Sequence, residues 1–207
     1  MLLQNPFAAI ATTGLDSGLL TVLSRVEHPL TIQEIMALMP GKGSAEGIRQ
    51  SAARLREHGV VLETIAGRTK SYLLNREHLL AGPIIQISNA KVALIHRVQE
   101  MIASWDPEPL CVELFGSTAR NEMRLESDID ILVVFADDTD EARIELLVSQ
   151  LAASIYRWTG NDARPLVYTA SEVSAAPIFD SIIREGINIG GDASWLRKHL
   201  RGERQKA

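Results

Sequence analysis

The segment Ile129–Phe135, with the sequence IDILVVF, constrains the fold more than any other because almost all of it is apolar. A short continuous apolar run of this kind is typical of a buried strand. Two carboxylates, Asp128 and Asp130, lie at its start. Side chains two positions apart in a strand face the same way, so these two project together. A carboxylate resists burial unless it meets a cation, a metal ion or hydrogen-bond donors. The sequence therefore predicts a charged site where this strand enters the core.

The elements predicted around this strand alternate between strands and helices. Apolar runs, helical spacing and turn residues are the signals used. They give a strand at 110–116, a short helix at 117–123, a strand at 128–135, a long helix at 141–160, a strand at 164–169, a helical segment at 171–186, and a short strand or extended segment at 187–191. Asp138 and Glu141 are expected to cap the long helix. This order is typical of a mixed α/β domain.

The first part of the chain has a different order, with three helices before a pair of strands. Leu15–Val26 has apolar residues at helical spacing, and Thr31 with Glu34 forms a capping-box pattern that starts a second helix. Ser44 is expected to cap a third helix that ends at Gly59. Two strand-like runs around a glycine turn then predict a hairpin.

Three helices followed by a hairpin resemble the winged helix-turn-helix family, over roughly residues 14–76. In that family the third helix enters the DNA major groove and the hairpin contacts the backbone. The resemblance therefore implies a DNA-binding surface on these two elements. Its candidate residues are Arg49, Gln50, Arg54, Arg56, Arg68 and Lys70. In the alternative interpretation these charges only solvate a helix face, and the module mediates dimerisation or protein contact.

We expect two domains joined by a helix. Apolar spacing between Ile87 and Trp105 predicts the connecting helix. The expected divisions are residues 1–77, 78–108 and 109–207. The first division carries eight Lys and Arg against seven Asp and Glu, whereas the rest of the chain carries 13 against 19. A near-neutral first part and an acidic second part are consistent with two domains that have different partners.

Composition excludes several classes of protein. The hydrophobic share of 46% and the charged share of 23% are typical of a globular chain rather than a disordered one. Cys111 is the one cysteine, so no internal disulfide can form, and no Cys/His cluster has zinc spacing. We expect neither a signal peptide nor a membrane-spanning helix, and hence a cytoplasmic protein.

Gly116 and Ser117 lie where the strand before the acidic pair ends and a helix begins. A glycine there lets another backbone or a ligand approach closely. The N–H groups at the helix start and the Ser117 hydroxyl are suited to phosphate oxygens. Mg²⁺ suits the carboxylates of Asp128 and Asp130, because it prefers oxygen ligands and is completed by water and substrate phosphates. Together these residues predict a site for a nucleoside triphosphate and a metal ion.

Two short motifs in this region resemble the polymerase β-like nucleotidyltransferase superfamily, in particular its small stand-alone prokaryotic members, over about residues 109–190. The motif residues are Gly116, Ser117, Arg120, Ser127, Asp128 and Asp130. The resemblance implies that the two carboxylates bind two Mg²⁺ or Mn²⁺ ions, which align the triphosphate with an acceptor hydroxyl. The Gly-Ser pair and Ser127 would contact the nucleotide. Arg120 would contact phosphate or form a structural salt bridge.

The sequence departs from this family in one respect. The family supplies a third carboxylate from the strand after the long helix, but the segment 164–169 contains no acid. Asp162 lies just before this strand and Glu172 just after it. Asp162 is the better candidate for the third catalytic carboxylate, although its place in the segment GNDA slightly favours a turn residue instead. Glu113, in the strand before the Gly-Ser pair, is a further acid: it could point into the same cleft or equally lie on the exposed side of that strand.

The expected function is Mg²⁺-dependent transfer of a nucleoside monophosphate, with AMP favoured, from a triphosphate to a hydroxyl. The acceptor could be a protein side chain, a small molecule or a nucleic-acid end. The resemblance makes a toxin–antitoxin role with a separate protein partner conceivable. The alternative is a DNA-binding regulator that senses a nucleotide without turning it over; a homodimer with its third helices one DNA turn apart would favour it. The missing third carboxylate favours the regulator, whereas the intact pair of Asp128 and Asp130 favours the enzyme.

Overall fold

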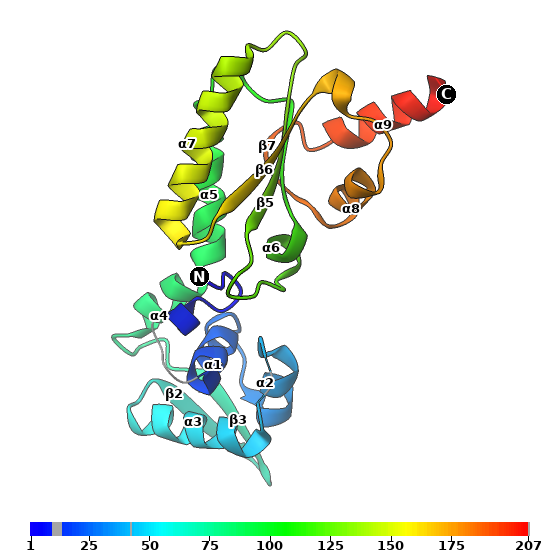
Figure 1. Cartoon of the computed structure of the whole chain (residues 1–207). Coiled ribbons are helices and arrows are strands. Elements are labelled where there is room, and N and C mark those ends of the chain that lie inside the picture. The colour runs from blue at the N-terminus through cyan, green and yellow to red at the C-terminus, as the bar shows by residue number, and fades with distance from the viewer. Residues whose placement is uncertain (10–13, 42, 207) are drawn as a thin grey trace. The chain divides into compact units, whose positions relative to one another are not determined.

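The computed structural model describes residues 1–9, 14–41 and 43–206, and it divides after Lys91 into two compact units (Figure 1). The segment 78–108, expected as one connecting helix, contains two. Helix α4 (Ala81–Ser88) belongs to the first unit, and almost all of α5 (Ala90–Ile102) belongs to the second. Within the described residues, no helix combines the length and the apolar composition needed to cross a membrane.

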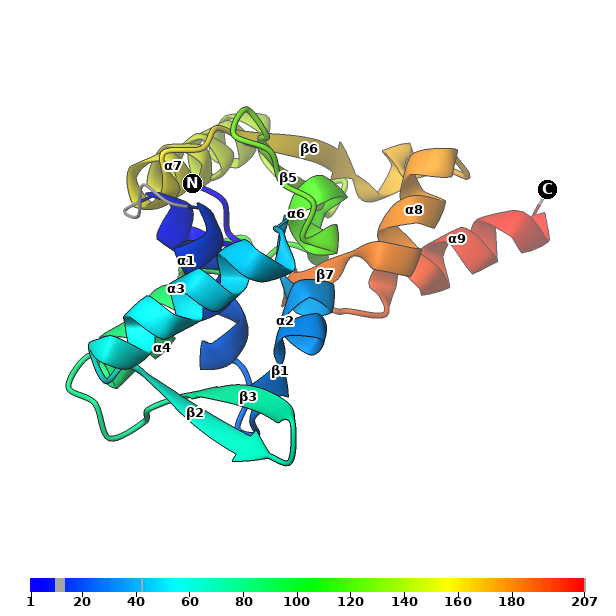
Figure 2. The ribbon, with the colours of Figure 1, turned by 90° about the horizontal axis from the view of Figure 1, so that it is seen from below.

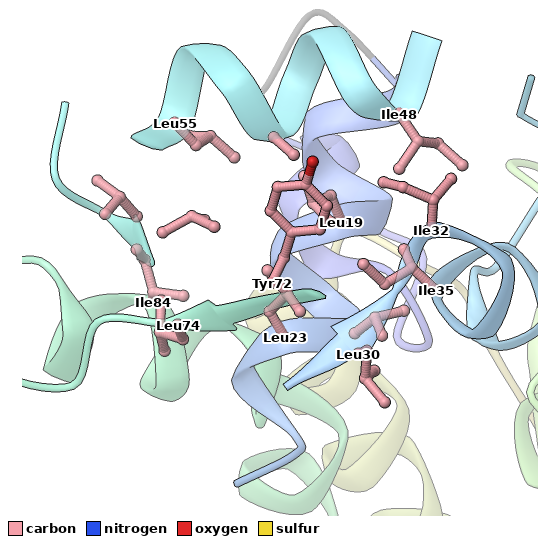
Figure 3. Packing of buried hydrophobic residues seen from close by; sticks show 14 of the residues in the cluster. Leu19, Leu23, Leu30, Ile32, Ile35, Ile48, Leu55, Tyr72, Leu74 and Ile84 are labelled. Atoms are coloured by element: carbon pink, nitrogen blue, oxygen red, sulfur yellow. The ribbon is translucent and has the colours of Figure 1, made fainter. Parts of the chain in front are cut away.

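The first unit combines helices with a small antiparallel sheet. Its elements are η1 (Pro6–Ala9), α1 (Gly14–Ser24), β1 (Leu30–Thr31), α2 (Ile32–Leu38), α3 (Ala45–Glu57), β2 (Val61–Ala66), β3 (Thr69–Leu74) and α4. The strands lie in the order β1-β3-β2, with the β2–β3 hairpin extending beyond β1 (Figure 2). Figure 3 shows the core, where Leu19 of α1, Ile35 of α2, Ile48 of α3 and Tyr72 of β3 point into one interior.

Local sequence signals in this unit are confirmed. Both bonds of the capping box are present, because the Thr31 backbone N–H donates to Glu34 Oε2 at 2.7 Å and the Glu34 N–H donates to Thr31 Oγ1 at 3.3 Å. Ser44 Oγ accepts from Gly47 N–H at 3.1 Å at the start of α3. The short strand β1 was not predicted, because its two residues carry no period of their own and are defined by pairing with β3.

The second unit is a four-stranded mixed sheet with helices on both faces. Its elements are α5, β4 (Cys111–Phe115), α6 (Gly116–Arg120), β5 (Ile129–Phe135), α7 (Glu141–Thr159), β6 (Ala163–Thr169), η2 (Ala170–Glu172), α8 (Pro177–Glu185), β7 (Ile187–Gly191) and α9 (Trp195–Lys206). The strand order is β6-β5-β4-β7; β5 and β6 are parallel and the other pairs antiparallel. Helices α5 and α7 cover one face, and α6, α8 and α9 lie on the other (Figure 1). The mixed α/β prediction is confirmed, with β5 buried in the middle of the sheet.

Three details of the second unit differ from the prediction. Helix α7 is capped by Asp140, whose Oδ1 accepts from Arg143 N–H at 2.8 Å, and not by Asp138 with Glu141. The segment 171–186 is not one helix: η2 ends at Glu172 and α8 begins at Pro177. A residue before proline is held extended, which stops a helix from running through this point. Helix α9 was not predicted.

Candidate functional site

The acidic pair lies at the start of the central strand β5. Asp130 is in the strand, and Asp128 precedes it with 22% of its side chain exposed. The residue paired with Asp130 on β4 is Phe115, and on β6 it is Arg164. The two carboxylates lie near enough for the charge of Asp128 to act on Asp130. Asp130 shares its face of the sheet with its neighbour Phe115, which packs in the core that includes α8.

Electrostatics make this pair unfavourable by itself. Burial raises the pKa of Asp130 above its ordinary value, and the neighbouring Asp128 carboxylate raises it further. Arg164 and Arg120 act in the opposite direction, because a nearby positive charge stabilises the ionised carboxylate. Two ionised carboxylates in a half-buried position attract a cation, so the pair has the charge that a hard metal ion prefers.

Gly116 lies against Asp130, and two features of the structure require a glycine at this position. Its φ of +67° lies in the left-handed region, which glycine adopts without strain. A Cβ at this position would also overlap with Oδ2 of Asp130. Glycine is thus required both by the turn from β4 into α6 and by the close approach of Asp130.

Ser117 and Ser127 occupy different surroundings. Ser117 is the second residue of α6, and its carbonyl accepts from Glu122 N–H at 2.9 Å. Ser127 shapes the loop before the acidic pair, because its Oγ accepts from Arg124 N–H at 2.8 Å. The Ser127 carbonyl accepts from the side chain of the buried Asn161 at 3.1 Å. Asn161 therefore fixes this loop to the start of β6. Its role was not predicted, because the contact joins segments far apart in the chain.

Arg120 is held by acids of its own unit. Its Nε lies 2.9 Å from Glu122 Oε2, and its Nη1 lies 3.0 Å from Glu185 Oε2. The second contact joins α6 to α8, which are 65 residues apart in the chain at these positions. Of the two roles foreseen for Arg120, the geometry favours the structural salt bridge.

Arg164 is the charged residue that sequence reasoning missed. Its Nε lies 2.5 Å from Asp128 Oδ2, while 75% of its side chain remains exposed. It stands on β6, in the strand where the resemblance had led us to look for an acid. The sequence showed that this strand contains no acid. It did not predict the ion pair, because that contact follows from the parallel register of β5 and β6.

The other acids do not join the pair. Asp162 is exposed, and its backbone carbonyl accepts from Ile129 N–H at 2.8 Å. Glu172 caps η2 by accepting from Thr169 N–H at 2.7 Å. Across the described ranges 1–9, 14–41 and 43–206, no three His, Cys, Asp or Glu side chains are grouped so that they could hold one metal ion. A third catalytic carboxylate is thus not found beside Asp128 and Asp130.

Glu113 is enclosed in separate surroundings. It is 7% exposed on β4, and its Oε1 accepts from Asn188 Nδ2 at 3.0 Å. Burial raises its pKa, although the Asn188 hydrogen bond and the charge of Arg197 oppose this. A cavity of about 210 Å³ lies beside it, lined by residues of α8, β7 and α9 including Gly186 and Arg197.

The residues present fit one divalent cation rather than two. Mg²⁺ takes one or two protein carboxylates and completes its shell with water and phosphate oxygens, which matches the pair of Asp128 and Asp130. A second ion needs a further oxygen ligand nearby, and the position next to Asp130 on β6 holds the cation Arg164 instead.

Most candidate DNA contacts in the first unit are paired with acids. On α3, Arg49 Nη1 lies 3.2 Å from Glu46 Oε2, and Gln50 donates to the same carboxylate. Arg54 pairs with Asp16 of α1, and both Arg56 and Lys70 pair with Glu63 of β2, at 3.2 and 3.1 Å. Arg68 is exposed in the β2–β3 turn. The positive charge available for phosphate on this surface is correspondingly reduced.

Comparison with known proteins identifies part of the second unit. Residues 98–173 match the family model of the nucleotidyltransferase domain, a segment that runs from α5 past β6 and includes the acidic pair. These residues therefore form a polymerase β-like nucleotidyltransferase domain. Among curated protein sequences, none matches the chain significantly.

Solved structures that the chain matches with low identity and low TM-scores include three toxin–antitoxin complexes. One, determined with AMP-PNP, is 17% identical, with 54% of this chain and 85% of that chain covered and a TM-score of 0.40. The MntA–HepT complex is 16% identical, with coverages of 56% and 85% and a TM-score of 0.38. A complex of the tri-AMPylated HEPN toxin of Shewanella oneidensis with the MNT antitoxin is 20% identical, with coverages of 56% and 93% and a TM-score of 0.36.

Proposed function

We propose, from the nucleotidyltransferase domain within residues 98–173, that the chain transfers a nucleoside monophosphate from a triphosphate to a hydroxyl, with ATP as donor and Mg²⁺ as the metal ion. One observation carries the proposal: Asp128 and Asp130 share one face at the mouth of the central strand, with the backbone of Gly116 pressed against Asp130. A buried strand gains nothing in stability from two adjacent carboxylates, so a ligand is the better explanation.

The chemistry assigns a role to each group. The oxygen of the acceptor hydroxyl forms a bond to the α-phosphorus, the bond from that phosphorus to the bridging oxygen breaks, pyrophosphate leaves, and the hydroxyl proton passes to water. Asp128 and Asp130 would hold the metal ion, which when bound neutralises phosphate charge. The hydroxyl of Ser117, at the start of α6, is suited to donate to the triphosphate.

Transfer is tested with labelled ATP, GTP, CTP and UTP on the full chain, with and without Mg²⁺, measuring nucleotide binding, pyrophosphate release and labelling of the protein itself. Asp128→Asn is the test variant. Asp138→Asn is its matched control, because it removes the same charge from an exposed position after β5. Release that needs Mg²⁺, disappears in Asp128→Asn and persists in Asp138→Asn supports the proposal. Binding of no nucleotide by the wild type refutes it.

A second candidate function is a nucleotide-sensing, DNA-binding regulator with a winged-helix first unit. Two observations favour it: the strand order β1-β3-β2 beside three helices, and Arg68 exposed in the turn of the hairpin. We expect weak, salt-dependent binding to duplex DNA, because the surrounding acids already pair with most of the basic residues. Fluorescence anisotropy over a range of salt concentrations tests this, and Arg68→Ala should lower the salt dependence by about one phosphate contact. Affinity that does not change with salt would contradict phosphate binding.

A further inference from the structure

The side of the acidic pair that faces β6 is closed by a positive charge. In the parallel register, Asp130 is paired with Arg164, so that the strand neighbours of Asp130 are one apolar and one cationic residue. Side chains two positions apart in a strand share a face, so the nearest other positions that could offer a metal ligand on this face are Leu166 of β6 and Asp162 just before it. Leu166 has no oxygen in its side chain, and Asp162 does not group with the pair. No oxygen ligand therefore comes to the pair from β6 among these positions.

Arg164 is held by charge rather than by packing. Its Nε lies 2.5 Å from Asp128 Oδ2, yet its side chain is 75% exposed, whereas that of Asp128 is 22% exposed. Its charge also stabilises the ionised form of Asp130. An exposed ion pair of this kind is weak, so a divalent cation can displace the guanidinium from Asp128. The displaced charge remains beside the site because the backbone of β6 fixes its origin.

The charges in the site decide how many metal ions it accepts. Two carboxylates carry a charge of −2, and Arg164 already offsets half of it. One divalent ion can still be held by both carboxylates. A second would meet the repulsion of the first ion and of Arg164 without a third carboxylate to hold it.

We propose that Arg164 takes the place of a second metal ion: the site binds one divalent cation, which displaces Arg164 from Asp128 but leaves its positive charge beside the site. This inference deepens the proposed function and rests on it for the role of the cation in catalysis. The number of ions bound is independent of whether any transfer occurs.

The test is a titration of the full chain with Mn²⁺ alone, followed by electron paramagnetic resonance of the free ion, on wild type and variants. The wild type should bind one Mn²⁺ per chain. Arg164→Ala should also bind one, about fivefold more tightly, because a competing charge has been removed from Asp128. Arg164→Lys should remain near wild type, since it restores the charge. Arg164→Glu supplies a third carboxylate and should bind a second ion.

Arg184→Ala is the matched control. Arg184 is 69% exposed and contacts a carboxylate in the same way, with Nε 3.1 Å from Glu185 Oε1, but that acid is not one of the pair. Its Mn²⁺ affinity should equal that of wild type. Two ions bound to the wild type, no binding at all, or an unchanged affinity in a folded Arg164→Ala variant would overturn the inference. One bound ion without any nucleotide transfer would leave the inference standing and count against the proposed function instead.

Discussion

Substitution of Gly116 by alanine tests whether the turn after β4 is built around Asp130. Two penalties are expected. The first is the left-handed backbone at φ +67°, which costs an L-residue roughly 1–2 kcal/mol. The second is the overlap of the new Cβ with Asp130 Oδ2. Because β5 is the buried central strand, relief must come from rotation of the Asp130 side chain, at about 0.5–1.5 kcal/mol for an unfavourable rotamer. The total is about 1.5–3.5 kcal/mol.

Gly160→Ala is a matched control for the backbone term alone. Gly160 has φ +69° and lies in the same unit, but a Cβ there would meet nothing within 4 Å. It should therefore lose only about 1–2 kcal/mol of unfolding free energy. The difference between the two variants isolates the contact with Asp130.

The assay is urea unfolding followed by tryptophan fluorescence. All three tryptophans, Trp105, Trp158 and Trp195, lie in the second unit, so the signal reports that unit and not the first. Titration with Mn²⁺ provides a second measurement on the same samples. Gly116→Ala should be less stable than Gly160→Ala and should bind Mn²⁺ poorly, whereas Gly160→Ala should bind it as wild type does. Equal losses of stability together with unchanged Mn²⁺ affinity in both variants would refute the reasoning.

Two further predictions concern charges. The pKa values of Asp130 and Glu113 are raised, mainly by burial, so the second unit should lose stability as pH rises from the ordinary values of 3.8 and 4.5 through the raised ones. Asp130→Asn and Glu113→Gln should each flatten this dependence in urea melts without metal. Of the two, only Asp130→Asn should lose the stabilisation by Mg²⁺, which is about 2.7 kcal/mol at a hundred times the Kd; equal Mg²⁺ responses would contradict the assignment. Arg120→Ala should cost up to about 1 kcal/mol, as should Glu185→Gln, because exposed ion pairs contribute little. Neither should weaken nucleotide binding, and a specific loss in Arg120→Ala would instead indicate a phosphate contact.

Features that depend on neighbouring residues in the chain were predictable from the sequence. The buried strand at 129–135 was evident from its apolar run, and the caps at Thr31 and Ser44 from side chains that reach N–H groups three residues away. The acidic pair was predictable for the same reason, because a separation of two residues within a strand sets a shared face. Local rules were sufficient for each.

Features that depend on pairing between distant segments were not predictable. The contact of Arg164 with Asp128 requires the parallel register of β5 and β6, which the crossover through α7 sets. The ion pair of Arg120 with Glu185 likewise requires α8 to lie beside α6. The sequence shows that β6 contains no acid. It does not show that Arg164 is the residue of β6 that lies beside the acidic pair.

The acidic pair lowers the stability of the second unit when no cation is bound, and a ligand is the best explanation for its presence. Without a cation, Asp128 and Asp130 repel each other at the mouth of a buried strand, and Asp130 is further disfavoured by burial. Arg164 reduces this cost at one carboxylate but leaves one negative charge uncompensated. Neutral residues at both positions would make a more stable strand, so stability alone does not account for them. Metal binding and folding are consequently linked: a cation bound by the pair must raise the unfolding free energy of the second unit, and its removal must lower that free energy again.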